Sequence, residues 1–147
     1  MEKRLNQLYL GLGSNLGNKI ENIEQAILLI HTEIGVISKK STYYFSQPQG
    51  FVSENDFVNM VVKVETYRTP FDVLAEIERI EKVVGRTSKS NGFFQDRLID
   101  IDILYYNNEK IHTDLLVIPH PFIFQRDFVQ VPLMEILDDI TLAALRH

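Results

Sequence analysis

One stretch of eight residues, Arg97 to Leu104, constrains the fold more than any other part of the chain. It contains Ile99, Ile101 and Ile103 at alternate positions. Because successive side chains of a strand point to opposite faces, the three isoleucines share one face. β-branched residues favour strands, so we predict a strand with this face in the core. The other face then carries Asp100 and Asp102, with their Cβ atoms about 6–7 Å apart.

Two carboxylates placed in this way have two interpretations. A pair of carboxylates on one face of a rigid element can bind one or two hard cations such as Mg²⁺. Aspartate is depleted in strands, however, and the same pair could form the solvated face of an edge strand. For the isolated motif both interpretations are open, and the rest of the chain must decide between them.

The composition excludes several classes of protein. The chain has 147 residues, of which 45% are hydrophobic and 24% charged, and this predicts one globular domain over residues 1–147. It has no cysteine, which excludes disulfides and zinc–thiolate sites. Its net charge of −5 argues against nucleic-acid binding. We find neither a signal peptide nor an apolar run long enough to span a membrane, so we expect a cytoplasmic protein.

Hydrophobic periodicity predicts the order strand, helix, strand, strand, helix, strand. The expected elements are residues 8–13, 19–34, 36–45, 57–65, 69–84 and 97–104, followed by a short helical piece around 122–128 and a further segment over 131–137. This order predicts an α+β fold with a ferredoxin-like βαββαβ core, an antiparallel sheet and both helices on one face. The long loops at 47–56 and 86–96 are of a kind that often forms part of an active site.

Two other stretches could bind a ligand or could simply be structural. The glycine-rich segment 11–17 lacks the residues of a P-loop and the spacing of a dinucleotide fingerprint. We interpret it as a tight turn between strand and helix, or as a turn whose Ser14 and Asn15 offer donors to a ligand. Phe57 and Asn59 share a strand face, where a ring and an amide suit a flat heterocycle, although core packing explains Phe57 equally well.

Cationic residues stand near the aspartates in the sequence. Arg86, Lys89 and Arg97 flank the loop that leads into the strand. Forked guanidinium groups beside carboxylate-bound Mg²⁺ are suited to a polyphosphate. His120, between two prolines, and Arg126 could supply further phosphate contacts, or the histidine could be structural.

Taken together, these motifs resemble those of the 6-hydroxymethyl-7,8-dihydropterin pyrophosphokinases (HPPK). The matching segments follow the family's order over nearly the whole chain: 11–17, 47–51, 56–59, 85–86, 96–104, 119–120, 126–128 and 132–133. The most specific part is Arg-x-x-Asp-x-Asp followed by Pro-His and Arg-x-Phe. The resemblance implies a ferredoxin-like α+β fold and transfer of pyrophosphate from ATP to the pterin hydroxymethyl group, which releases AMP in folate biosynthesis.

The resemblance also implies roles for individual residues. The implied catalytic residues are Arg86, Arg97, Asp100 and Asp102, of which the two aspartates would bind two Mg²⁺ ions. The implied ATP-binding residues are Glu81, Arg86, Arg97, Ile103, His120 and Arg126. The implied pterin-binding residues are Ser46, Gln47, Gln49, Phe57, Asn59, Asp100 and Phe128, with the two phenylalanines on either side of the ring. We expect a monomer whose partners are these two substrates, with no nucleic acid and no membrane.

The chain departs from the family in the loop before Arg97. Residues 93–96 differ from the usual family residues, and Ser88 replaces a second loop arginine, so Phe94 and Lys89 are candidate substitutes. Two other functions stay open on the sequence. One is a ferredoxin-like module that binds a nucleotide or pterin without turnover, and the other is a different metal-dependent transferase with an Asp-x-Asp motif. Pterin-dependent formation of AMP distinguishes the pyrophosphokinase from both.

Overall fold

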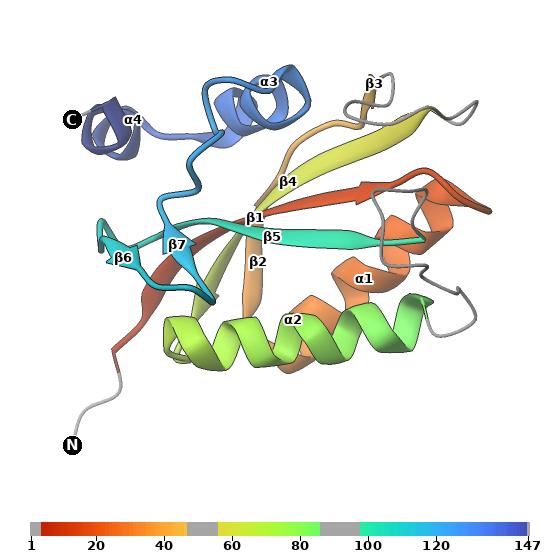
Figure 1. Cartoon of the computed structure of the whole chain (residues 1–147), viewed down its shortest axis with the longest axis horizontal. Helices are drawn as coiled ribbons and strands as arrows, with labels where there is room; N and C mark the ends of the chain where they lie inside the picture. Colours follow the sequence, from red (N-terminus) through yellow and green to blue (C-terminus); the bar gives the residue numbers. More distant parts are fainter. Residues whose placement is uncertain (1–3, 47–55, 86–97, 147) are drawn as a thin grey trace.

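An antiparallel sheet with helices on both faces forms the body of the structure (Figure 1). The computed structural model describes residues 4–46, 56–85 and 98–146. The strands are β1 (Asn6–Ser14), β2 (Val36–Lys40), β3 (Tyr44–Ser46), β4 (Phe57–Thr66), β5 (Asp100–Tyr106), β6 (Ile111–His112) and β7 (Val117–Ile118). The helices are α1 (Lys19–Glu33), α2 (Pro70–Gly85), α3 (Asp127–Ile136) and α4 (Asp139–Arg146). In this part of the chain, no helix is long and apolar enough to cross a membrane.

The main sheet has the strand order β2-β4-β1-β5, and β3 also pairs with β4. All of these pairs are antiparallel, so together with α1 and α2 they confirm the predicted ferredoxin-like βαββαβ core. The prediction of a single strand over residues 36–45 is wrong in one respect. The structure has two strands in this stretch, β2 and β3, with a gap between them. In the gap, the Ser41 hydroxyl accepts a hydrogen bond from the Val61 N–H at 2.9 Å and so takes the place of a main-chain partner.

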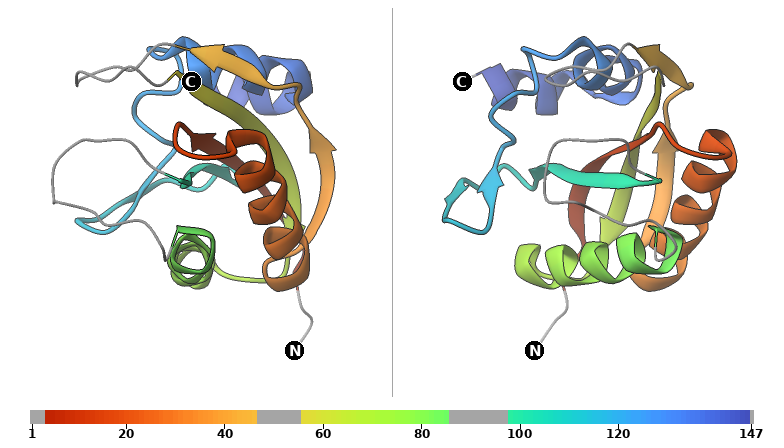
Figure 2. Two further views of the ribbon diagram at one scale, coloured as in Figure 1. Left: turned by 90° about the vertical axis from the view of Figure 1, so that its right-hand side faces the viewer. Right: turned by 45° about the vertical axis from the view of Figure 1, so that its right-hand side comes forward.

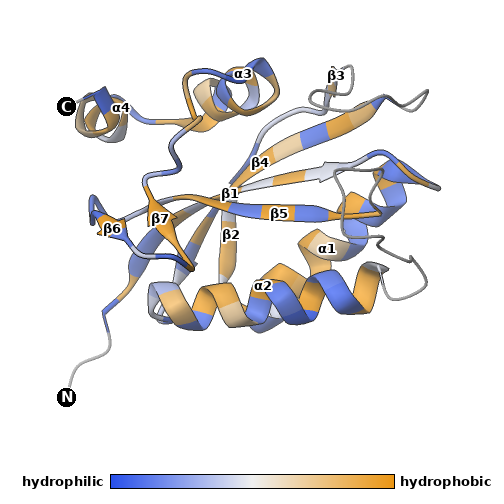
Figure 3. Cartoon of the chain, in the orientation of Figure 1, coloured by the Kyte–Doolittle hydropathy of each residue, from blue (hydrophilic) through white to orange (hydrophobic). Residues whose placement is uncertain are grey.

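Helices α1 and α2 cover one face of the sheet (Figure 2). The core beneath them takes alternate residues of the strands, among them Leu8, Leu10, Leu12, Val58, Met60, Val62, Val64, Ile99, Ile101 and Ile103. Figure 3 shows the same alternation as bands along β5. Both helices begin at side-chain caps: Asn18 accepts from the Glu21 N–H at 3.2 Å, and the Thr69 hydroxyl accepts from the Asp72 N–H at 3.2 Å.

The opposite face of the sheet is covered only in part, by α3. A second apolar cluster forms here from Tyr9, Val61, Leu104, Tyr105, Ile123, Val129, Leu133 and Ile136. The helical piece expected around 122–128 is wrong in position, since α3 begins at Asp127. Helix α4 was not predicted. None of its residues is buried, and its 8 residues make little more than two turns, which is short for recognising a periodic apolar pattern in a sequence.

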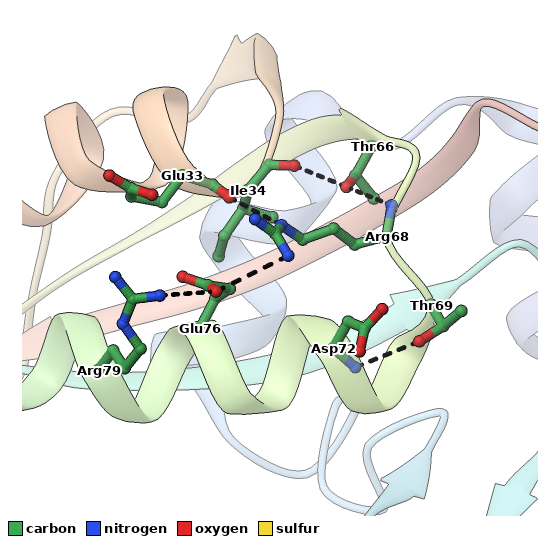
Figure 4. A network of polar contacts seen from close by, with 8 residues as sticks. All are labelled: Glu33, Ile34, Thr66, Arg68, Thr69, Asp72, Glu76 and Arg79. Atoms are coloured by element: carbon green, nitrogen blue, oxygen red, sulfur yellow. Dashed lines mark hydrogen bonds and ion pairs between the residues drawn. The ribbon is translucent and has the colours of Figure 1, made fainter. Parts of the chain in front are cut away.

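A polar network around Arg68 and the buried carboxylate of Glu76 joins α1, β4 and α2 (Figure 4). It lies at the end of the sheet remote from the aspartates. Glu76 is 8% exposed, and its Oε1 lies 2.9 Å from Arg79 and 3.7 Å from Arg68. Arg68 also donates from Nε to the Glu33 carbonyl oxygen at 2.8 Å, and its N–H donates to the Thr66 hydroxyl at 3.0 Å. Arg68 therefore fastens the end of α1 to α2.

We expect Arg68→Met to lower the free energy of unfolding by about 2 kcal/mol, because it leaves a buried carboxylate and a helix end with fewer partners. Arg79→Met is the matched control. Its side chain is 66% exposed, so its ion pair with Glu76 is screened and the expected loss is about 0.5 kcal/mol. Urea unfolding followed by circular dichroism measures both values, and equal losses would contradict the role given to Arg68.

Candidate active site

Two glycines of β1 stand opposite the two aspartates of β5. The antiparallel register pairs Gly11 with Asp102 and Gly13 with Asp100. Residues that lie directly opposite in a sheet share a face, and a glycine places no side chain beside its partner's carboxylate. Both aspartates are half-buried and lie on the sheet face away from α1 and α2, as the alternation predicts. The register thus fixes the two carboxylates on one face of β5, with no β1 side chain directly opposite either of them.

Gly13 is also where β4 meets the site. The register places Asn59 opposite Gly13, on the side away from β5. A Cβ at Gly13 would lie 2.7 Å from Asn59 Nδ2 and 3.7 Å from Cδ1 of the Phe57 ring. Asn59 is 7% exposed, and the Ser46 hydroxyl of β3 donates to its Oδ1 at 3.2 Å. The structure therefore brings Ser46, Phe57 and Asn59 together on β3 and β4. Strand β1 lies between β4 and β5, the strand that carries Asp100.

The rest of the glycine-rich segment is structural. Ser14 and Asn15 are fully buried, and the Ser14 hydroxyl accepts a hydrogen bond from Asn22 Nδ2 at 3.3 Å. Gly17 has a φ of 66°, the left-handed conformation that favours glycine in a tight turn. These contacts favour the interpretation as a turn over the interpretation as a ligand site. The turn begins after Ser14, because β1 extends to that residue.

A carboxylate from α2 reaches the outer edge of β5. Glu81 Oε2 accepts a hydrogen bond from the Ile101 N–H at 2.9 Å. In the strand order β5 is the outermost strand, so this N–H faces away from β1. Glu81 thus holds the main chain between the two aspartates. Ile103 is also an implied ATP-binding residue, but its side chain is 5% exposed and lies in the core beneath α1 and α2, not beside the carboxylates.

A β-bulge at the far end of β5 connects the strand to His120. Ile103 pairs with Leu10 and Tyr105 pairs with Tyr9, which leaves Leu104 as the extra residue. The Leu104 carbonyl oxygen accepts a hydrogen bond from the His120 N–H at 3.0 Å. The bulge therefore attaches the Pro-His segment, which follows β7 in the chain, to the aspartate strand.

The side chains of His120 and Arg126 lie close to one another. His120 is half-buried, and its Nδ1 accepts from the Phe122 N–H at 3.2 Å, which places the proton of the neutral ring on Nε2. Burial lowers the pKa of His120, the Arg126 guanidinium lowers it further, and Asp100 partly opposes both effects. The Arg126 guanidinium lies 4.4 Å from the centre of the Phe122 ring and 5.8 Å from that of Phe128.

The carboxylate pair consists of side chains that a magnesium ion commonly takes as ligands. Among residues 4–46, 56–85 and 98–146, no three His, Cys, Asp or Glu side chains gather as they would in a zinc or calcium cage. Mg²⁺ commonly takes one or two carboxylates and completes its shell with water and phosphate oxygens. Asp100 and Asp102 suit that role. The other candidates, Gln47, Gln49, Arg86, Lys89, Phe94 and Arg97, lie outside the described residues.

Sequence reasoning missed the part played by Gly11 and Gly13. The pattern that could have revealed it is their spacing, because two glycines two residues apart on one strand match two aspartates two residues apart on another. The fold and the site together define a class: a ferredoxin-like α+β protein with a pair of carboxylates on one face of its sheet.

Comparison with known proteins identifies the family within this class. Residues 9–138 match the model of 7,8-dihydro-6-hydroxymethylpterin-pyrophosphokinase (HPPK). The 2-amino-4-hydroxy-6-hydroxymethyldihydropteridine pyrophosphokinase of Aquifex aeolicus is 45% identical over 88% of this chain and 79% of its own length. The enzyme of the same name from Bacillus subtilis is 37% identical over 92% of this chain and 80% of its own length. The chain belongs to the HPPK family.

A solved structure agrees with this fold. The HPPK-DHPS triple mutant of Plasmodium falciparum matches with a TM-score of 0.74 at 18% identity. The match covers 92% of this chain and 40% of that chain, so this chain spans about two-fifths of that larger protein. At such low identity the likeness concerns the fold alone.

We expect Gly13→Ala to weaken pterin binding about tenfold, because the added Cβ would displace the Asn59 amide from its hydrogen-bonding position. Gly11→Ala is the matched control, since its Cβ would meet Leu104 at an ordinary contact distance of 3.5 Å. Calorimetric titration with the pterin, in the presence of Mg²⁺ and a non-hydrolysable ATP analogue, measures both affinities. Similar losses in the two variants would contradict the placement of Asn59.

Proposed function

We propose that the sheet face bearing Asp100 and Asp102 performs the reaction of the HPPK family. Family membership makes this chain a pyrophosphokinase, which transfers pyrophosphate to 6-hydroxymethyl-7,8-dihydropterin in folate synthesis with ATP as co-substrate. What supports the site assignment is the register that sets Asp100, Gly13 and Asn59 side by side on three adjacent strands. A carboxylate of the kind that binds Mg²⁺, Asp100, therefore lies near an amide that suits a heterocycle, Asn59. The transfer requires both kinds of group.

The proposed pterin pocket lies on the side of β4 and β3. Because the Ser46 hydroxyl donates to Asn59 Oδ1, the Nδ2 group is directed over Gly13, where it can donate to an acceptor at the edge of the pterin. Phe57 provides a ring for stacking on one side, and Phe128 is the proposed partner on the other. The remaining proposed members of the pocket are Gln47, Gln49 and Asp100.

The proposed nucleotide site lies on the side of β5. Two Mg²⁺ ions held by Asp100 and Asp102 would neutralise charge on the ATP phosphates. His120 in its neutral form presents an Nε2–H donor, and Arg126 presents a guanidinium of the kind that binds phosphate. A contact from Ile103 to the nucleotide would come from its main chain at the edge of β5. Glu81 supports the site by holding the Ile101 N–H.

The loop arginines complete the proposal. Arg86 and Arg97 are proposed phosphate ligands by their positions in the family motif, and with the two aspartates they form the proposed catalytic set. Phosphoryl-type transfer asks a protein mainly for alignment and charge stabilisation, which such a set supplies. The extent of the domain as residues 1–147, a monomeric state, the absence of a nucleic-acid partner and a cytoplasmic location stay predictions of the sequence.

A single assay separates the pyrophosphokinase from the other two functions. Protein incubated with ATP and Mg²⁺ should form AMP only when hydroxymethyl-dihydropterin is added. A binding module would take up the pterin in calorimetry yet form no AMP. A different metal-dependent transferase would bind nucleotide without any response to pterin, so either result from folded protein would overturn the proposal.

We expect Asp100→Asn and Asp102→Asn each to lower kcat at least about a hundredfold, because each removes a charged ligand of the proposed metal ions. Both side chains are half-buried, and we expect the free energy of unfolding to change by less than about 1 kcal/mol. Asp139→Asn, on exposed helix α4, is the control for the loss of one charge. AMP formation and thermal unfolding measure the two effects, and retained turnover in both site variants would refute the metal assignment.

A further inference from the structure

A carboxylate of α3 holds the edge of the sheet at the gap between β2 and β3. The Thr42 N–H and the Thr42 hydroxyl both donate to Glu135 Oε1 at 2.9 Å, and the hydroxyl lies 3.0 Å from Oε2. On the side of β4, the Ser41 N–H donates to the Val61 carbonyl oxygen at 2.9 Å, and the Ser41 hydroxyl accepts from the Val61 N–H at 2.9 Å. The gap is therefore held from both sides, by the sheet and by the helix.

Helix α3 and the edge of the sheet at β3 both carry residues of the proposed pterin pocket. Glu135 follows Phe128 by seven positions on α3, about two turns, so the two side chains lie on the same side of the helix. Along the edge, β3 follows Thr42 and ends at Ser46, which pairs with Phe57. One contact between Glu135 and Thr42 thus joins the two elements that present Phe128 and Ser46.

Strand β3 needs such a support because it is short. It pairs with β4 over three residues, Tyr44 to Ser46, and Phe45 between them is 64% exposed. No residue of β3 is fully buried, so the hydrogen bonds along this edge contribute to the position of Ser46, whose hydroxyl orients the Asn59 amide. The two hydrogen bonds from Thr42 to the Glu135 carboxylate, close to the start of β3, are directional.

We propose that Glu135 is a positioning residue for the pterin pocket and acts through Thr42. Glu135 holds the segment between β2 and β3 and so sets the position of β3 against α3. The position of β3 in turn determines where Ser46 lies relative to Phe128. Glu135 and Thr42 are both exposed, so water can replace their hydrogen bonds and their loss costs little global stability. The loss of these hydrogen bonds instead weakens the binding of the pterin. This inference rests on the proposed pterin pocket.

The test compares the Michaelis constants of the two substrates in variants of the contact. We expect Glu135→Ala and Thr42→Val to raise KM for the pterin about three- to tenfold, with KM for ATP, kcat and the melting temperature nearly unchanged. Thr42→Ser keeps the hydroxyl donor and should behave as the unaltered protein. Asp139→Asn removes a carboxylate from the neighbouring helix and controls for charge.

Combining the two substitutions completes the test. Because Thr42→Val removes only hydrogen bonds that Glu135→Ala also removes, Glu135→Ala with Thr42→Val should raise KM for the pterin little more than Glu135→Ala alone. An unchanged pterin KM in folded Glu135→Ala, or parallel changes for pterin and ATP, would overturn the proposal. Phe57→Ala shows which proposal has failed. If it leaves pterin KM unchanged, the pocket itself is wrong, whereas if it raises KM while Glu135→Ala does not, only the role of Glu135 is wrong.

Discussion

The pairing of β5 with β1 is the interaction on which the rest of the site depends. On one face of β5, isoleucines pack into the core beneath α1 and α2, and this burial fixes the strand. On the other face, Asp100 and Asp102 stand opposite Gly13 and Gly11, so the carboxylates are rigidly placed and only half-buried. Full burial of two such charges would be costly without a cation.

Groups from helices and loops bind main-chain groups of this sheet that its own strands leave unpaired. Glu81 of α2 accepts the Ile101 N–H at one edge, and Glu135 of α3 accepts the Thr42 N–H at the other. His120 donates its N–H to the carbonyl oxygen at the bulge of β5. Main-chain groups at sheet edges need partners, and here each partner also fixes a strand that carries a proposed site residue. The network around Glu76 stabilises the opposite end of the sheet.

The comparisons separate what the fold requires from what the reaction requires. At 18% identity the Plasmodium falciparum structure still shares the fold, because a fold depends on the pattern of buried and exposed positions more than on particular residues. The bacterial relatives, at 37–45% identity, cover most of this chain and carry the assignment of the reaction. Function resides in a few groups on a common scaffold, and in this chain the proposed groups that the structure describes lie on β3, β4, β5, α2 and the segment from His120 to Phe128.

The sequence by itself determined the order of the elements of the βαββαβ core and the faces of the long strands, because hydrophobic periodicity is a local property. The resemblance to a family supplied the individual roles of the candidate site residues. Only the tertiary structure decided that Gly11 and Gly13 stand beside the aspartates, that the Ile103 side chain lies in the core, and that Ser41 interrupts a predicted strand. Local pattern sets the direction in which a side chain points. The residue that it meets depends on register, which contacts between distant segments establish.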